Sequence, residues 1–130
     1  MREILFRGKF SEKSRWSYGD LYTDHGKVYI ATRDTMHGVR VHEEVIPDTV
    51  GQFTGLMDKH GRKIFEGDIV VLTLPAAKMH WRAVCKFHSG AFGLVWHHMG
   101  GRWQAFTGIC NAEYEIIGNV HDNPELMEDE

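Results

Sequence analysis

The segment from Gly51 to Thr73, GQFTGLMDKHGRKIFEGDIVVLT, constrains the fold of this chain most strongly. It alternates short β-forming runs with two tight turns, in which an aspartate can bond its own backbone and a glycine allows a positive φ. The turns fall at 58–61 and 66–68, and the run at 69–72 is long enough for a central strand. The segment therefore predicts three strands joined by tight turns, which we interpret as the start of a small β-barrel.

Short strands separated by polar or glycine-containing turns are predicted along the rest of the chain as well. The clearest is 81–88, where alternation gives one inward-facing set: Trp81, Ala83, Cys85 and Phe87. Segment 32–38 is polar and is predicted to be a loop. The other predicted strands are 3–10, 15–22, 27–31, 39–45, 91–96, 103–106 and 114–120. So many short strands indicate a mostly β fold.

Pro47 separates two groups of predicted strands, because proline fixes φ and lacks the N–H donor of a sheet ladder. We place the domain boundary at 47–51. Near the C-terminus, Asp122 or Asn123 can cap a short helix that begins at Pro124. The predicted parts are an N-terminal β-sheet at 1–47, the barrel at 48–121, and an acidic tail or short helix at 122–130.

Length and composition favour an ordinary folded protein. The chain has 130 residues, of which 42% are hydrophobic and 25% are charged. No apolar run approaches the roughly 20 residues that span a bilayer, and the residues after Met1 do not resemble a signal peptide. We therefore expect a cytoplasmic protein with no membrane partner. Cys85 and Cys110 can pair or stay reduced, and reduced thiols are the simpler interpretation in the cytoplasm.

Nine histidines raise the hypothesis of a metal site. The densest group of possible ligands is His80, Cys85, His88, His97, His98 and Cys110. Neighbouring residues on a strand face opposite sides, and the chain has neither C-x-x-C nor H-E-x-x-H spacing. We therefore predict no metal and no cofactor, and a metal-dependent enzyme is the less favoured alternative.

Catalytic residues are equally hard to find in the sequence. Glu66 and Asp68 are spaced to share a face of a strand, as paired carboxylates do in acid–base catalysis. They flank Gly67 at a predicted bend, however, where acidic residues commonly form turns. Ser89 lies in no G-x-S-x-G elbow. We therefore predict a protein that is not an enzyme.

A surface for single-stranded nucleic acid is predicted in 78–106, where basic and aromatic residues are interleaved. Residues 51–112 carry seven lysines and arginines against three acidic residues, a modest balance of +4. Residues 113–130 carry seven acidic residues and no basic ones, so this tail could occupy the surface itself. The candidate contacts are Lys78, Arg82, Lys86, Arg102 and Trp103.

Self-assembly is the other predicted role. The run Ile69–Leu72 is apolar on both faces of its strand, so one face fills the core and the other needs a cover. That cover is either the N-terminal sheet or another subunit. Short strands also leave edges that pair across a two-fold axis. We therefore expect a homo-oligomer.

Two segments resemble the YopX-like family of phage and prophage proteins: GQFTGLMDKHGRKIFEGDIV at 51–70 and YEIIGNVHDNPEL at 114–126. EILFRGK near the start and WSYGDL at 16–21 add to the similarity, whereas 74–112 is particular to this chain. The resemblance implies an SH3-type barrel after a small β-rich part. It also implies a bacterial host cell and a phage or host protein as partner. It implies no activity and no site residues.

Overall fold

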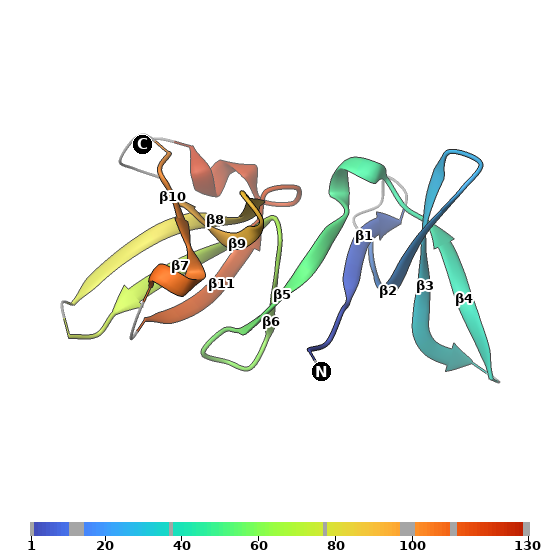
Figure 1. Ribbon diagram of the computed structural model, residues 1–130, viewed down its shortest axis with the longest axis horizontal. Helices are drawn as coiled ribbons and strands as arrows, with labels where there is room; N and C mark the ends of the chain where they lie inside the picture. The colour runs from blue at the N-terminus through green and yellow to red at the C-terminus, as the bar shows by residue number, and fades with distance from the viewer. Residues whose placement is uncertain are drawn as a thin grey trace. The chain divides into compact units, whose positions relative to one another are not determined.

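A computed structural model describes residues 2–10, 15–36, 38–76, 78–96, 101–109 and 112–128, and at 33–36 and 79 it describes only the backbone. The fold is mostly β, as predicted. The chain divides into two compact units, Met1–Gly55 and Leu56–Glu130 (Figure 1). The sequence placed a boundary slightly earlier, at 47–51. No helix in the described ranges is long and apolar enough to cross a membrane.

The N-terminal unit is built on antiparallel strands in the order β4-β3-β2-β1-β5, and β6 follows β5 in the same sheet. The bounds are β1 Phe6–Phe10, β2 Arg15–Asp24, β3 Lys27–Met36, β4 Val39–Glu44, the 3-10 turn η1 Pro47–Thr49, and β5 Gly51–Met57. The loop predicted at 32–38 is wrong, because β3 continues to Met36. Its polar residues still pair with β4, after a register shift between Ala31 and Thr35.

The β2–β3 hairpin turns through only two residues, His25 and Gly26. Their φ angles are 49° and 80°, and Asp24 pairs directly with Lys27. Two consecutive positive φ angles are what a two-residue hairpin of this hand requires, and glycine meets that requirement at the second position. The turn between the strands predicted at 15–22 and 27–31 is therefore present, and β2 and β3 extend further into it than predicted.

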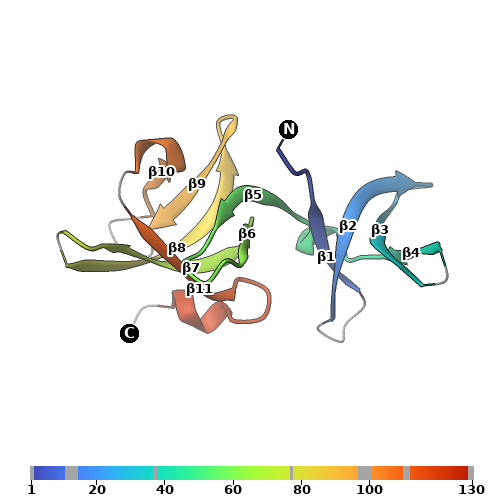
Figure 2. The same cartoon turned by 90° about the horizontal axis from the view of Figure 1, so that it is seen from below.

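The C-terminal unit contains a five-stranded antiparallel sheet in the order β10-β9-β8-β7-β11 (Figures 1 and 2). Its elements are β6 Lys63–Phe65, β7 Asp68–Leu74, β8 Met79–His88, β9 Ala91–Trp96, β10 Trp103–Ala105, η2 Phe106–Gly108, β11 Glu113–Asn119 and η3 Pro124–Met127. Within the described ranges β10 and β11 do not pair, so the sheet is open and the predicted closed barrel is not confirmed.

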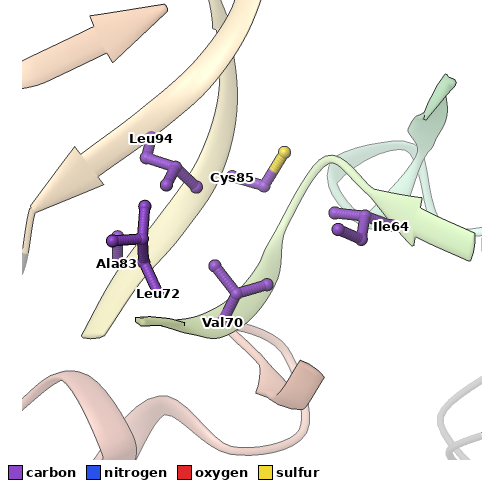
Figure 3. Close-up of a cluster of buried hydrophobic side chains, with 6 residues drawn as sticks. All are labelled: Ile64, Val70, Leu72, Ala83, Cys85 and Leu94. Atoms are coloured by element: carbon purple, nitrogen blue, oxygen red, sulfur yellow. The ribbon is translucent and has the colours of Figure 1, made fainter. Parts of the chain in front are cut away.

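A hydrophobic core lies on one face of this sheet (Figure 3). Its fully buried members are Ile64, Val70, Leu72, Ala83, Cys85 and Leu94. They come from one face of β7, β8 and β9 because alternate residues of a strand point the same way, and Ile64 joins them from β6. Trp81 packs against this core from the position paired with Leu72, which confirms the predicted inward face at that end of β8.

Phe87 is the exception on that face, and its predicted burial is wrong. Its side chain is 54% exposed, because it lies at the end of β8 beyond the core. It contacts Phe92 instead, with ring centroids 5.0 Å apart in an edge-to-face arrangement. Phe87 and Phe92 are paired directly across β8 and β9, and such aromatic cross-strand pairs stabilise a sheet.

The opposite face of the sheet is covered by the C-terminal segment, which forms the 3-10 turn η3 below the sheet in Figure 2. Ile69 and Val84 pair on this face and are 0% and 6% exposed. Next to them, Nη1 of Arg82 donates to the carbonyl oxygen of Leu126 over 2.7 Å. The second apolar face of β7 thus has a cover from within the same unit, which the sequence analysis did not consider.

A glycine makes this docking possible. Gly118 pairs with Ile69, and a Cβ built on it would lie 2.6 Å from Oδ1 of Asn123 and 2.9 Å from Cδ1 of Leu126. Both distances are shorter than real Cβ contacts, so the missing side chain is what lets η3 approach β11. The helical turn predicted at 122–130 is therefore present, and it is held by tertiary contacts.

The turn after β5 is tied to β11 by the carboxylate of Asp58. Its Oδ1 accepts hydrogen bonds from the backbone N–H groups of His60 and Arg62, both at 2.9 Å, and its Oδ2 accepts one from Ile116 N at 3.1 Å. The Arg62 side chain pairs with the same carboxylate at 2.9 Å and donates to the Ile116 carbonyl at 2.8 Å. Burial raises the pKa of Asp58, but these hydrogen bonds outweigh it and lower the pKa from 3.8 to about 2.

Replacing Asp58 by asparagine should destabilise the protein at neutral pH by about 2 kcal/mol, the linkage value of this pKa shift. Because the folded-state pKa is depressed, the contribution is complete above pH ~4 and is lost as the pH falls toward ~2. Urea unfolding between pH 7 and pH 2.5 should show the wild type and Asp58→Asn converging in acid. Glu113→Gln, an exposed change on β11, is the control. A constant difference between wild type and Asp58→Asn across this range would contradict the assignment.

Gly118→Ala should lower the free energy of unfolding by about 1–3 kcal/mol, since the new methyl group overlaps Asn123 and Leu126. Ile117→Ala is the matched control on the same strand, because Ile117 is 37% exposed and its truncation should cost less. Denaturant unfolding measures both values. Equal or smaller loss for Gly118→Ala would show that η3 does not pack as described.

Candidate functional site

The sheet of the C-terminal unit carries a cleft of about 430 Å³, which we call the tryptophan cleft. It is lined by Trp81, Trp96, Arg102, Trp103 and Gln104. A neighbouring cavity of about 260 Å³ shares Trp81, Trp96 and Gln104 and continues toward Leu72 and Ile109. A volume of this size lies within the range of roughly 300–1,000 Å³ that holds small ligands.

Strand register brings two of the indoles together. Trp96 on β9 pairs with Ala83 on β8, one alternate position from Trp81 on the same face. The two indole rings meet edge to face, with centroids 5.9 Å apart and planes at 69°. Both rings also pack against the core, so one side of each is fixed while the other borders the cleft.

Two glycines position Gln104, the polar residue common to both cavities. Gly93 pairs with Ala105, and a Cβ on Gly93 would lie 2.3 Å from the carbonyl oxygen of Gln104, so β10 can approach β9 only at a glycine. A Cβ on Gly108 would lie 2.1 Å from Nε2 of Gln104. The missing side chain at 108 therefore leaves the space in which the carboxamide lies.

The indole nitrogen of Trp103 is a buried polar atom in the lining of the cleft. Nε1 is buried, and within the described part of the chain it has no hydrogen-bond partner. The ring lies edge to face with His88, with centroids 5.1 Å apart. A buried donor left unpaired costs about 1–3 kcal/mol, so an acceptor placed there would be bound favourably.

The charge of the lining is positive. Arg102 is exposed and brings a guanidinium to the rim of the tryptophan cleft. No aspartate or glutamate is among the described residues that line either cavity. The cleft therefore offers aromatic walls, one cation and one carboxamide to a ligand.

The five nucleic-acid contacts predicted from the sequence do not all meet here. Arg102 and Trp103 line the cleft. Arg82 alternates with Trp81 on β8 and bonds the Leu126 carbonyl on the opposite face. Lys78, in the turn before β8, and Lys86, on β8, are exposed and do not line the cleft. The tail segment around Leu126 likewise covers the face opposite to Trp81, so it does not occupy the cleft.

The metal-ligand candidates are also dispersed. Nδ1 of His80 lies 3.1 Å from Oγ1 of Thr73, His88 contacts Trp103, and Cys85 is fully buried in the core. In the ranges that the structure describes, no three histidine, cysteine or acidic side chains form a cluster that could hold a metal. The remaining candidates, His97, His98 and Cys110, lie outside the described residues.

The paired carboxylates at 66 and 68 form a turn, as the simpler interpretation predicted. Oδ2 of the buried Asp68 accepts the backbone N–H of Phe65 at 2.7 Å. Gly67 has a φ of 89°, and its N–H donates to the carbonyl of Cys85. Ser89 occupies the β8–β9 turn with a φ of 51°. Asp68, Gly67 and Ser89 therefore stabilise or form turns of the backbone.

A second aromatic surface, on the N-terminal sheet, was not found from the sequence. Tyr22 and Tyr29 form a cross-strand pair and stack with centroids 5.2 Å apart, and the Tyr22 hydroxyl lies 2.8 Å from Nδ1 of His42. On the neighbouring strands, the Arg7 guanidinium lies 4.5 Å from the ring centroid of Trp16. Trp16 and Tyr22 occupy alternate positions of β2, and the pairing of Tyr22 with Tyr29 places the Tyr29 ring on the same face.

Comparisons with known proteins agree with the described fold. Residues 5–128 match the family described as YopX protein. The crystal structure of protein EF1440 from Enterococcus faecalis is similar with a TM-score of 0.59 and 23% identity, covering 98% of this chain and 100% of that one. Protein yopX from Bacillus subtilis is similar with a TM-score of 0.63 and 20% identity, covering 100% and 99%. No curated protein matches the chain. These identities show a shared fold.

Proposed function

The chain belongs to the YopX protein family, and from this premise we propose that it is a non-catalytic binding protein whose ligand occupies the tryptophan cleft. The observation that carries the proposal is the cleft lining, in which three indoles, a guanidinium and a carboxamide surround about 430 Å³. Aromatic walls with a few fixed polar groups are typical of ligand sites.

The polar residues that resembled catalytic groups support a binding role. Asp68 holds a turn, and His80 and His88 each contact a different neighbour. Catalysis by proton transfer needs an acid or base within hydrogen-bond reach of a reacting group in a cleft. The described lining of the tryptophan cleft consists of residues that bind and orient.

The setting we propose is the one that the family resemblance implies. The protein would act in the cytoplasm of a bacterium that carries a phage or prophage, with a phage or host protein as partner. The same resemblance supports an SH3-type barrel for the C-terminal unit.

The indole N–H signals of the four tryptophans test the binding proposal directly, because Trp16 lies in the other unit and serves as an internal reference. Two-dimensional NMR during a screen of aromatic fragments should shift the signals of Trp81, Trp96 and Trp103 and leave that of Trp16 in place. Gln104→Ala should weaken the binding of the fragments that shift them. A screen in which no fragment moves the cleft signals more than that of Trp16 would refute the proposal.

A second candidate function is self-assembly through β4. This strand is the last in its sheet order, and its Val39 and Val41 are 66% and 46% exposed. An outer strand with exposed apolar side chains is a template for pairing with another strand. We propose a second copy of this chain as the occupant, since antiparallel pairing about His42 would bring Arg40 opposite Glu44 in both directions.

Light scattering after size exclusion should give a mass above one chain at micromolar concentration. Val41→Lys should return the protein to a monomer, since a lysine on the edge opposes strand pairing. Met57→Lys, at a position 49% exposed in β5, should leave the mass unchanged. A monomeric wild type would remove this candidate and would leave the binding proposal untouched.

A further inference from the structure

We propose that the tryptophan cleft binds one planar heteroaromatic ring that carries a phosphate group. The ring and phosphate can come from a free nucleotide or from one nucleotide of a single strand. This inference rests on the proposed binding function and names the chemical class of its ligand. A single-nucleotide site replaces the extended nucleic-acid surface that the sequence predicted along 78–106. Only two of the five predicted contacts, Arg102 and Trp103, line the cleft.

We infer the aromatic part of the ligand from the indole side chains that line the cleft. Trp81 and Trp96 lie edge to face, pack against the core and line the cleft, so their rings form preorganised aromatic walls. Stacking of a base on an aromatic side chain contributes roughly 1–3 kcal/mol and works for any base, since every base has a π-face. A cavity of about 430 Å³ is near the lower end of ligand sites, which suits a single ring and its substituents.

The polar part of the ligand follows from two groups that an apolar ring would leave unused. The buried Nε1–H of Trp103 has no acceptor among the described residues, and a hydrocarbon ligand would leave it so. Nε2 of Gln104 donates to the Ala105 carbonyl oxygen over 3.4 Å, so the second N–H and the carboxamide oxygen are the groups it presents to a ligand, and the absence of a side chain at Gly108 leaves room for the carboxamide. Heteroaromatic rings carry such acceptors and donors on their edges, so these two groups favour a base over a plain aromatic ring.

The positive charge at the rim of the cleft is the reason for proposing a phosphate on the ligand. Arg102 stands at the rim, and among the described residues of the lining no carboxylate opposes it. A guanidinium matches a phosphate with two parallel hydrogen bonds and keeps its charge at any ordinary pH. The acidic segment that includes Leu126 lies on the opposite face of β8, next to Arg82, and so does not compete for this rim.

The test titrates the full chain with adenosine 5′-monophosphate, adenosine, ribose 5-phosphate and a single-stranded deoxyadenosine decamer. The indole signals of Trp81, Trp96 and Trp103 report binding, and Trp16 is the reference. We expect the monophosphate to shift the cleft signals and to bind more tightly than adenosine or ribose 5-phosphate. Arg102→Gln should weaken the binding of the monophosphate by roughly fivefold, the upper range for one exposed ion pair, and should leave the binding of adenosine unchanged.

Three further variants separate the individual contacts. Trp103→Phe keeps a ring but removes the N–H, and Gly108→Ala forces the Gln104 carboxamide to move; each should weaken the monophosphate severalfold. Lys86→Gln removes an exposed cation of the same sheet that does not line the cleft, and it should have no effect. Unfolding curves for each variant identify any loss that comes from misfolding.

The two sources of the ligand give different results, and both support the proposal. A decamer that binds much more tightly than the monophosphate, with affinity falling steeply in salt, identifies a single strand. A decamer that binds no more tightly identifies a free nucleotide. The proposal would be overturned if adenosine and the monophosphate bound with equal affinity and Arg102→Gln left the affinity for the monophosphate unchanged. It would also be overturned if fragments shifted the cleft signals while all four probes left them unmoved, an outcome that leaves the proposed binding function standing.

Discussion

The C-terminal unit depends on covering both faces of β7. Ile69 faces one side of the sheet while Val70 and Leu72 face the other, and all three are buried. Exposing two such faces to water would cost about 25 cal/mol for each Å² of apolar surface, so each face needs its own cover. Ile64 of β6 and the partly buried Phe106 and Ile109 pack onto the core face, and the C-terminal turn η3 covers the other.

This double cover decides where a ligand site can form. The face of Ile69 and Val84 is closed by the chain's own end, so it offers no surface for binding. The core face ends in Trp81 and Trp96, which are only partly buried. Both rings line a cleft, whose polar groups come from the edge strand β10 and from Arg102 just before it. The candidate site thus lies at the edge of the hydrophobic core, where the core residues are only partly buried.

Glycines lie at several points where two elements of the C-terminal unit approach each other closely. Gly93 lets β10 reach β9, Gly108 makes room for the Gln104 side chain, and Gly118 admits η3. At each of these positions a Cβ would lie within 3 Å of another atom. The Asp58 carboxylate acts by a different principle, because it satisfies backbone donors from both its own turn and β11. Of these contacts, those at Gly93 and Gly108 border the residues that line the cleft.

The sequence by itself determined the mostly β character, the two turns at 58–61 and 66–68, and the inward face that begins at Trp81, because alternation and turn chemistry are local properties. The family resemblance was also fixed by local motifs, at 51–70 and 114–126. Only the tertiary structure decided that Phe87 lies outside the core, that η3 covers Ile69, and that Trp103 joins Trp81 and Trp96 at one cleft. Those outcomes depend on strand order and on which segment docks on which face. Contacts between residues far apart in the chain leave no periodic signal in the amino-acid sequence.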